Sequence, residues 1–397
     1  MTPKRILILG AGYSGTVVAN KVARECRKQI AKEEIEVLIL DKNEISINQG
    51  GFTFIPFGLY DPEDIIRPRK KLLSPRVKTV FGEDGNVSNL DLNARKVTAS
   101  SGREYEYDYL IIATGCSPDI DSIPGLKDEL NTFYTSIEDA NKIGKLISSI
   151  DKGNITISVA RMPIPCPGAI VKFTFMLDSY LKHIRKIRDQ INITLLWPME
   201  PIGPPTFNKL VTEKLEEAGV KVIRNFMLAE VDGKNKEVLS KAGAREKYDI
   251  LITVPPYKPA KALIDSAITN ETGWISSDKT TLQYRGPAGN HDDVFVLGDT
   301  GPADMLKTGI GAHYQSLVVS HNLINIIHGH EVSPLYLGET GCPLITTMVT
   351  PSTQGEAYIA SWGYEKPLKE FKPTKMGWYL YRMYYYIHWD ASLKGVI

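Results

Sequence analysis

The chain has 397 residues, enough for two or three domains that each bury a hydrophobic core. Its 47 basic and 46 acidic residues leave a net charge of +1, which gives no electrostatic basis for binding nucleic acid. The four cysteines are far apart in the sequence, so their spacing predicts neither a disulfide framework nor a metal site. No stretch reaches the roughly 18 apolar residues of a membrane-spanning helix, and the first strand begins too early for a cleaved signal, so we expect an intracellular protein.

The N-terminal segment predicts a strand, a glycine loop and a helix in direct succession. The apolar run ILIL leads into GAGYSG, in which Gly10 permits a tight turn, Gly12 lets the backbone approach a pyrophosphate, and Gly15 lets the helix pack closely on the strand. The next apolar strand, EVLIL, ends in Asp41, whose carboxylate can accept hydrogen bonds from a ribose hydroxyl. This succession predicts a dinucleotide-binding unit.

Two later strands end in short motifs of small residues. YLIIATG runs into Ala113, Thr114 and Gly115, and VFVLGDT carries Gly298 and Asp299. Together with the N-terminal glycine loop, these motifs resemble in kind and in order those of the pyridine nucleotide–disulfide oxidoreductase superfamily, flavoproteins with two dinucleotide-binding domains. The resemblance implies FAD as the cofactor, with the late aspartate near its ribityl chain and phosphates.

The middle of the chain repeats the strand-then-helix pattern but lacks the glycine loop. ITISVA is followed by RMPIPCPGA, where three prolines remove N–H donors and Gly168 is the one glycine. Such a loop disfavours a nicotinamide dinucleotide at this place, and with it the reduction of a flavin by NADH. It holds Cys166 instead, and the apolar spacing from Ala169 onward predicts a helix directly after it.

Cys166 is therefore expected just ahead of a helix N-terminus. The helix dipole and the free N–H groups there stabilise negative charge, which predicts a thiolate of low pKa and a good sulfur nucleophile. A buried, inert cysteine is the alternative that this local argument leaves open. Lys172, Lys182 and Arg185 fall outside the apolar positions of the helix.

Four stretches resemble the sulfide:quinone oxidoreductase family: CPGAIVKFTFMLDSYL, DILITVPPYKPAKAL, GWISSDKTTLQY and LKTGIGAHYQSLVVSHNL. The resemblance implies FAD-dependent oxidation of sulfide, or of a related sulfur or thiol donor, with transfer of the electrons to a membrane quinone. It also implies cysteine persulfide or disulfide chemistry, with Cys166 and Cys342 as the catalytic residues. The FAD-binding residues that it implies are Gly10, Ala11, Gly12, Ser14, Gly15, Asp41, Val87, Ala113, Thr114, Gly115, Gly298, Asp299, Lys307 and Thr308.

The partner of Cys166 stays open at this point. In the archaeal members of the family the second cysteine lies a few residues beyond Cys342, where this chain has Thr346 and Thr347. Cys116, directly after the ATG motif, is a further candidate, although a packed small residue is the more common role of such a cysteine. Three alternatives remain: a one-cysteine variant, an NADH:quinone flavoenzyme, and a flavoprotein subunit of a membrane redox complex without turnover of its own.

The C-terminal segment from residue 376 onward is rich in tyrosine and tryptophan and poor in charge. It is too short and too polar to span a bilayer, but it suits a helix that lies at a membrane interface. With the family resemblance, this predicts peripheral, monotopic association with the cytoplasmic side of the cell membrane and access for quinone at the C-terminal helices. An aromatic dimer interface or a core helix is the alternative, and a homo-oligomer stays open.

The order of these elements predicts an α/β fold with two Rossmann-like domains, the second inserted into the first, and a small C-terminal domain with aromatic amphipathic helices. We expect the FAD-binding domain at residues 1–115 and 290–328. The second Rossmann-like domain, which carries Cys166, is expected at residues 116–289, and the C-terminal domain, as the membrane and quinone interface, at residues 329–397.

Overall fold

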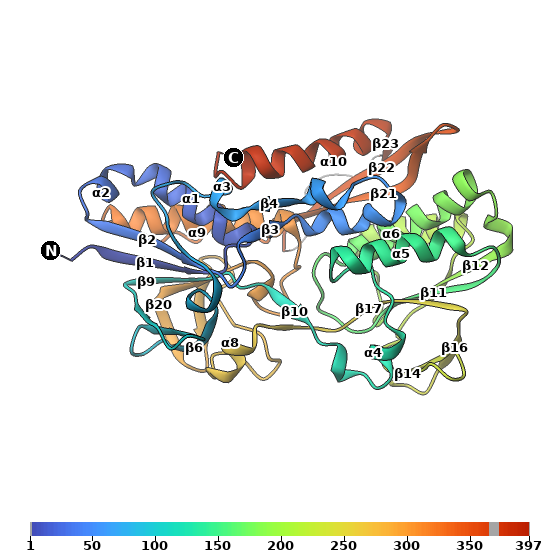
Figure 1. Ribbon diagram of the computed structural model, residues 1–397, viewed down its shortest axis with the longest axis horizontal. Helices are drawn as coiled ribbons and strands as arrows, with labels where there is room; N and C mark the ends of the chain where they lie inside the picture. Colours follow the sequence, from blue (N-terminus) through green and yellow to red (C-terminus); the bar gives the residue numbers. More distant parts are fainter. Residues whose placement is uncertain (1, 365–372, 397) are drawn as a thin grey trace.

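The computed structural model describes residues 2–364 and 373–396, and its largest sheet joins segments that are far apart in the chain (Figure 1). In spatial order the strands of this first sheet are β19 (Gln283–Gly286), β20 (Gly289–Val296), β9 (Tyr109–Ile112), β1 (Lys4–Leu9), β2 (Ile35–Leu40) and β5 (Lys78–Val80). β19 and β20 are antiparallel, and the other neighbours run parallel. The carboxyl ends of the parallel strands therefore meet at one edge of the sheet.

Both faces of the first sheet are covered. Ile8 of β1 packs with α1 (Tyr13–Glu25) and α9 (Gly309–Ile327), whereas Leu9 packs on the opposite side. Successive residues of a strand point to opposite faces, so a parallel strand covered on both sides is apolar throughout. The opposite face carries a small sheet of β6 (Val87–Asp91), β7 (Lys96–Ala99) and β8 (Glu104–Glu106).

The second sheet is entirely parallel and lies beside the first, at the right of Figure 1. Its strands, in spatial order, are β13 (Lys221–Ile223), β12 (Ile191–Leu196), β11 (Gly153–Val159) and β17 (Ile250–Val254). The helices that share a core with it are α5 (Ile137–Ser149), α6 (Gly168–Tyr180) and α7 (Pro205–Glu217). Its other face packs on a three-stranded sheet of β14 (Leu228–Asp232), β15 (Glu237–Ser240) and β16 (Arg245–Lys247). The α/β class and the two Rossmann-like units expected from the sequence are confirmed.

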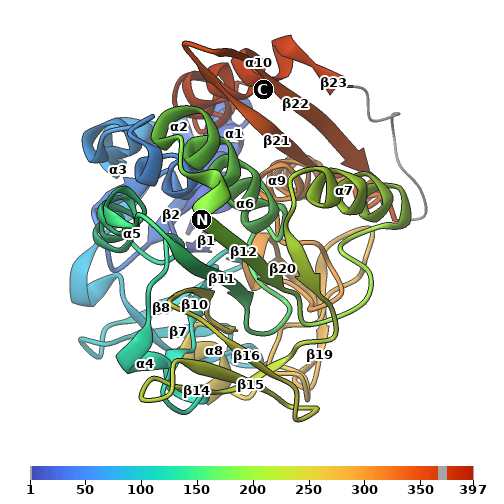
Figure 2. The ribbon, with the colours of Figure 1, turned by 90° about the vertical axis from the view of Figure 1, so that its right-hand side faces the viewer.

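The C-terminal part is a strand hairpin with one long helix. The hairpin pairs β21 (Thr340–Thr350) with β22 (Thr353–Trp362), which pairs with β23 (Pro373–Thr374), and α10 (Lys375–Ile387) follows. Figure 2 shows these strands and α10 on the same side of the molecule, and α8 (Lys261–Asp265) lies on the opposite side. Trp378 and Tyr385 of α10 are buried in the core that α6 shares. None of the helices within the described residues has the length and hydropathy needed to cross a membrane.

The segment before β19 packs on the first sheet. Leu263 of α8, Ile268 and Ile275 belong to the core cluster that holds Leu7 and Leu9. We therefore propose that the second unit ends near residue 259, at the short pair of β10 (Cys116–Pro118) and β18 (Tyr257–Pro259), and not at residue 289. The remaining short helices and strands are α2 (Arg27–Ala31), β3 (Ile45–Ile47), β4 (Ile66–Pro68), α3 (Arg69–Leu72) and α4 (Leu126–Glu129).

Candidate active site

The loop between β1 and α1 is shaped by close backbone contacts and leaves room at one position. A Cβ on Gly10, whose φ is +94°, would lie 2.4 Å from the carbonyl oxygen of Ala113, and one on Gly15 would lie 1.9 Å from that of Gly10. At Gly12 an added Cβ would meet none of the described atoms within 4 Å. α1 begins at Tyr13 without a side-chain cap or an acidic residue in its first turn. Its first N–H groups are therefore available to the phosphates of a dinucleotide.

Asp41 follows β2, and its side chain contacts the same loop. Oδ2 accepts a hydrogen bond from the Ala11 N–H at 2.7 Å and lies 3.2 Å from Nη1 of Arg69. A Cβ on Gly85, shortly before Val87 and β6, would lie 2.4 Å from the carbonyl oxygen of Asp41. The segment of Val87 therefore borders this end of the sheet. The buried Arg69 was missed in the sequence, where it stands within the basic run RPRKK and carries no distinguishing signal.

The ATG and GDT motifs contact each other and the glycine loop. The Thr114 hydroxyl lies 3.3 Å from that of Thr300, which also donates to the carbonyl oxygen of Gly115 at 3.2 Å. A Cβ on Gly298 would lie 2.8 Å from Oγ of Ser14 in α1. The three motifs thus come together at the carboxyl ends of β1, β9 and β20, the edge at which open α/β sheets bind ligands.

Asp299 and Lys307 lie next to this junction and act on each other electrostatically. Lys307 is buried, and its Nζ donates to a backbone carbonyl oxygen at 2.8 Å and lies 3.8 Å from the ring centroid of Trp274. Burial lowers the pKa of Lys307 to about 8, although the Asp299 carboxylate opposes the shift. Burial raises the pKa of Asp299, which Lys307 opposes in turn. Thr308 caps α9, because its hydroxyl accepts a hydrogen bond from an N–H of the first turn at 2.9 Å.

Cys166 and Cys342 form a pair whose thiols lie close enough to shift each other's pKa. Cys166 precedes α6 directly, and Cys342 is on β21. Gly168, the first residue of α6, permits this approach, since a Cβ there would lie 2.2 Å from Sγ of Cys342. The N–H of Cys166 donates to the carbonyl oxygen of Lys307. The cysteine pair is therefore joined to the segment that follows the GD motif.

The two thiols of the pair differ in pKa. The hydrogen bond with Cys342 lowers the pKa of Cys166 to about 7, with help from the Lys172 charge and the Ala169 N–H and against the effect of burial. The hydrogen bond with Cys166 and burial together raise the pKa of Cys342 well above its ordinary value. The site thus favours a Cys166 thiolate that accepts a hydrogen bond from the Cys342 thiol.

Two residues beside the pair were not expected from the sequence. Lys172 is only 1% exposed, and its Nζ donates to the hydroxyl of Tyr381 on α10 at 2.8 Å. The hydroxyl of Tyr134 donates to the carbonyl oxygen of Cys166 at 2.9 Å. The sequence signal for the burial of Lys172 is the apolar residues on all sides of the predicted helix, because a helix that is apolar all round is buried. Tyr134 has no comparable signal.

The other candidate partners do not make this contact. Cys116 opens β10, and burial raises its pKa well above the ordinary value. The hydroxyl of Thr346 donates to Oε1 of Glu356 at 2.8 Å. Cys26 is fully buried at the end of α1. Cys342 is the cysteine whose thiol the structure brings to Cys166.

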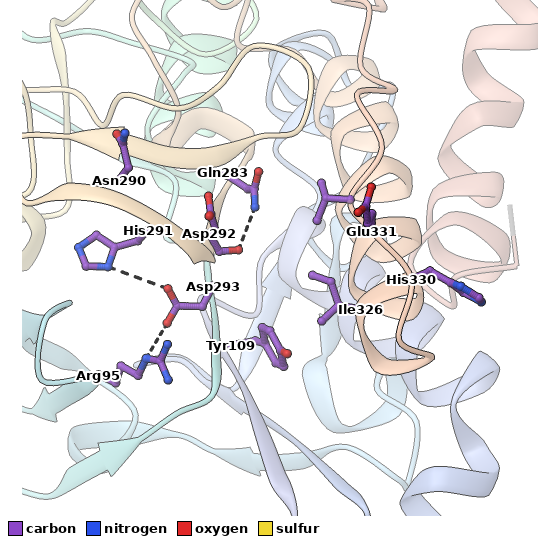
Figure 3. Close-up of a pocket in the computed structure, with 11 residues that line it drawn as sticks. Arg95, Tyr109, Gln283, Asn290, His291, Asp292, Asp293, Ile326, His330 and Glu331 are labelled. Atoms are coloured by element: carbon purple, nitrogen blue, oxygen red, sulfur yellow. Dashed lines mark hydrogen bonds and ion pairs between the residues drawn. The ribbon is translucent and has the colours of Figure 1, made fainter.

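A cavity of about 720 Å³ lies at the other end of the first sheet (Figure 3). Arg95 and Asp293 form an ion pair of 2.9 Å on its wall, and Tyr109 and Ile326 also line it. Tyr109 begins β9, so the cavity is at the amino ends of the parallel strands, opposite the edge that binds ligands in such sheets. Ile326 is near the end of α9, which starts beside the cysteine pair and is about 28 Å long at ~1.5 Å per residue. The cavity is therefore remote from the motifs and the cysteines.

Comparisons with known proteins agree with this arrangement. Residues 3–156 match the family described as pyridine nucleotide-disulphide oxidoreductase. A mitochondrial sulfide:quinone oxidoreductase of Dictyostelium discoideum is 26% identical over 405 residues, covering 98% of this chain and 86% of the relative. A type II NADH:quinone oxidoreductase of Staphylococcus haemolyticus is 30% identical over 358 residues, covering 83% of this chain and 84% of the relative. The structure of the sulfide:quinone oxidoreductase from Aquifex aeolicus has the same fold, with a TM-score of 0.79 at 18% identity, covering 99% of this chain and 92% of that one.

FAD is the cofactor of this family, and the residues described above fit it. Open space at Gly12 and the uncapped start of α1 suit its pyrophosphate, and the ATG and GDT motifs meet where its flavin half is expected. Relatives over nearly the whole chain carry the name of one enzyme. The chain is an FAD-dependent oxidoreductase that belongs to the sulfide:quinone oxidoreductase family, within the pyridine nucleotide-disulphide oxidoreductases.

Proposed function

We propose that the protein oxidises sulfide at the Cys166–Cys342 pair and passes the electrons through FAD to a quinone. The observation that carries the proposal is the contact of two thiols of unequal pKa, joined through the Lys307 carbonyl oxygen to the flavin motif. The names of the relatives that match almost the full chain support the same donor and acceptor.

The two cysteines account for the sulfur steps. When they form a disulfide, hydrosulfide attacks one sulfur, the S–S bond between the cysteines breaks, and a new S–S bond forms. The thiol of lower pKa is the better leaving group, so Cys166 leaves as a thiolate and Cys342 carries the persulfide. Joining that thiolate to the persulfide as a trisulfide releases one proton and two electrons. Bound FAD supplies the two-electron acceptor and the path to the quinone.

NADH as the electron donor is the alternative, since the relatives include type II NADH:quinone oxidoreductases. The pyrophosphate of a nicotinamide nucleotide would need the N-terminus of α6. A sulfur atom fills that place, because Sγ of Cys342 lies against Gly168, and proline residues precede it in the loop. The geometry therefore favours sulfide over NADH.

We also propose that α10 provides contact with the membrane and access for the quinone. Its exposed large apolar residues recur at helical spacing, whereas Trp378 and Tyr385 face the core. Tyrosine, methionine and leucine on one side of a helix favour the boundary between headgroups and acyl chains. The exposed residues are Met376, Tyr379, Leu380, Met383, Tyr386 and Ile387.

Flavin absorbance under anaerobic conditions tests the function. Sulfide should bleach the flavin of the wild-type protein, and the rate should fall by several orders of magnitude in Cys166→Ser and Cys342→Ser, since a serine hydroxyl is not ionised near neutral pH. Cys26→Ser is the control, because Cys26 is buried at the end of α1 and takes no part in the pair. Undiminished bleaching in Cys166→Ser would rule out the cysteine mechanism. Bleaching by NADH as fast as by sulfide would rule out the proposal that sulfide is the electron donor in preference to NADH.

A further inference from the structure

Lys172 is a buried cation that has no carboxylate partner within the described part of the chain. It lies in the middle of α6 and is 1% exposed, and among the described residues no aspartate or glutamate forms an ion pair with it. Its Nζ donates to the hydroxyl of Tyr381 at 2.8 Å and lies 4.2 Å from the centroid of that ring. Burying an ammonium group is unfavourable unless a charge or hydrogen-bond acceptors compensate it, so its surroundings must supply that compensation.

The compensation comes from the cysteine pair and from α10. Burial acts to lower the pKa of Lys172, but Tyr381, Cys342 and Cys166 outweigh it and raise that pKa above its usual value. Lys172 is therefore charged in the folded protein at neutral pH. The ionisable groups that act on Cys166 or respond to it are Cys342 on β21, Lys172 on α6, Asp299 after β20, Tyr134 before α5, and Tyr381 and Tyr384 on α10. Lys172 is the cation in this set.

We propose that Lys172 is a positioning residue that holds the negative charge of Cys166, and that Tyr381 of α10 fixes the ammonium group for this task. The ring of Tyr381 also packs against that of Phe54, with a centroid distance of 5.3 Å. The reactivity of the thiol then depends on the docking of α10, the helix whose outer residues are exposed. The inference rests on the proposed nucleophilic role of Cys166 but on neither sulfide nor quinone turnover.

The pH dependence of alkylation tests this role directly. The rate of Cys166 modification by iodoacetamide is followed by mass spectrometry on the FAD-loaded protein between pH 5 and 10. In Lys172→Met the midpoint of the thiolate titration should rise by about one pH unit or more, because an adjacent opposite charge shifts a pKa by about 1–3 units. A rise of one unit makes alkylation at pH 7 about tenfold slower at most.

Two further variants keep the test decisive. Tyr381→Phe keeps the ring but loses the acceptor for Nζ, so its midpoint should also rise, by less than that of Lys172→Met. Lys182→Met is the control, because Lys182 follows α6 but is exposed, and its midpoint should equal that of the wild type. An unchanged midpoint in both Lys172→Met and Tyr381→Phe, with FAD still bound, would overturn the proposal. If Lys172→Met fails to fold, an unchanged midpoint in Tyr381→Phe alone overturns it. A failure of the wild type to oxidise sulfide would leave this result intact.

Discussion

Replacing Gly168 by alanine should separate the two thiols without touching either one. An added Cβ would lie 2.2 Å from Sγ of Cys342, whereas ordinary contact begins at 3.4 Å, so sulfur and helix must move apart by about 1.2 Å. A disulfide needs a Cβ–Cβ distance of about 3.5–4.5 Å, and a displacement of this size exceeds that ~1 Å window. Overpacking of this kind also costs about 1–3 kcal/mol of unfolding free energy. We therefore expect slower cross-linking and lower stability together.

The assay follows the Cys166–Cys342 cross-link after addition of diamide to the reduced protein, by mass spectrometry of alkylated peptides. Gly168→Ala should cross-link at least tenfold more slowly than the wild type and unfold at lower urea concentration. Gly309→Ala is the matched control, because Gly309 opens α9 as Gly168 opens α6 and its added Cβ meets none of the described atoms within 4 Å. Alanine elsewhere in a helix gains up to ~1 kcal/mol over glycine, so a loss at Gly168 is the opposite of the helix-propensity effect. Wild-type cross-linking and stability in Gly168→Ala would refute the reasoning.

Two further predictions concern the C-terminal part. Burial lowers the pKa of His388 from 6.5 to about 4, so the unfolded chain takes up the proton first as the pH falls below 6.5, and stability falls with it. Between pH 7 and pH 5, the free energy of unfolding should therefore fall by about 2 kcal/mol less in His388→Phe than in the wild type, as measured by urea unfolding at both pH values. An equal fall in both proteins would contradict this prediction. Met383→Glu on the exposed side of α10 should reduce sedimentation with phosphatidylcholine–phosphatidylglycerol vesicles at least about fivefold, since it removes apolar area from the interface. Ile264 is an exposed residue of α8, the helix on the opposite side of the molecule from α10, so Ile264→Glu should sediment like the wild type. Equal sedimentation of both variants would exclude α10 as the contact.

Most of the fold could be predicted because its signals are local. A short apolar strand, a glycine loop and a helix follow one another within the first 25 residues, and the ATG and GD motifs end similar strands. The packing of residues 261–289 on the first sheet could not be predicted in this way. Leu263 has no local feature that distinguishes the core it joins from that of the second sheet.

In the candidate site too, features with a local sequence signal could be predicted, and features that depend on tertiary packing could not. The position of Cys166 ahead of α6 follows from neighbouring prolines and apolar spacing, which are local. Whether Cys342 or Thr346 faces it depends on how β21 lies along α6, which is a matter of tertiary packing. The burial of Lys172 depends on Tyr381, which is 209 residues away in the chain. A lysine is normally placed at the surface, and although the apolar residues around this one indicate a buried helix, they do not indicate Tyr381 as its partner.

The interleaving of the two sheets also sets an order in which the chain can fold during synthesis. All strands of the second sheet lie between residues 153 and 254, so this sheet can close while the ribosome is still adding later residues. The first sheet has to wait for β20, whose Val294 pairs with Leu110 of β9 across the whole inserted unit, and such distant pairing is slow. Cys342 emerges later still, on β21. The reactive thiol pair is therefore assembled last, when the strands that carry the flavin motifs are already present.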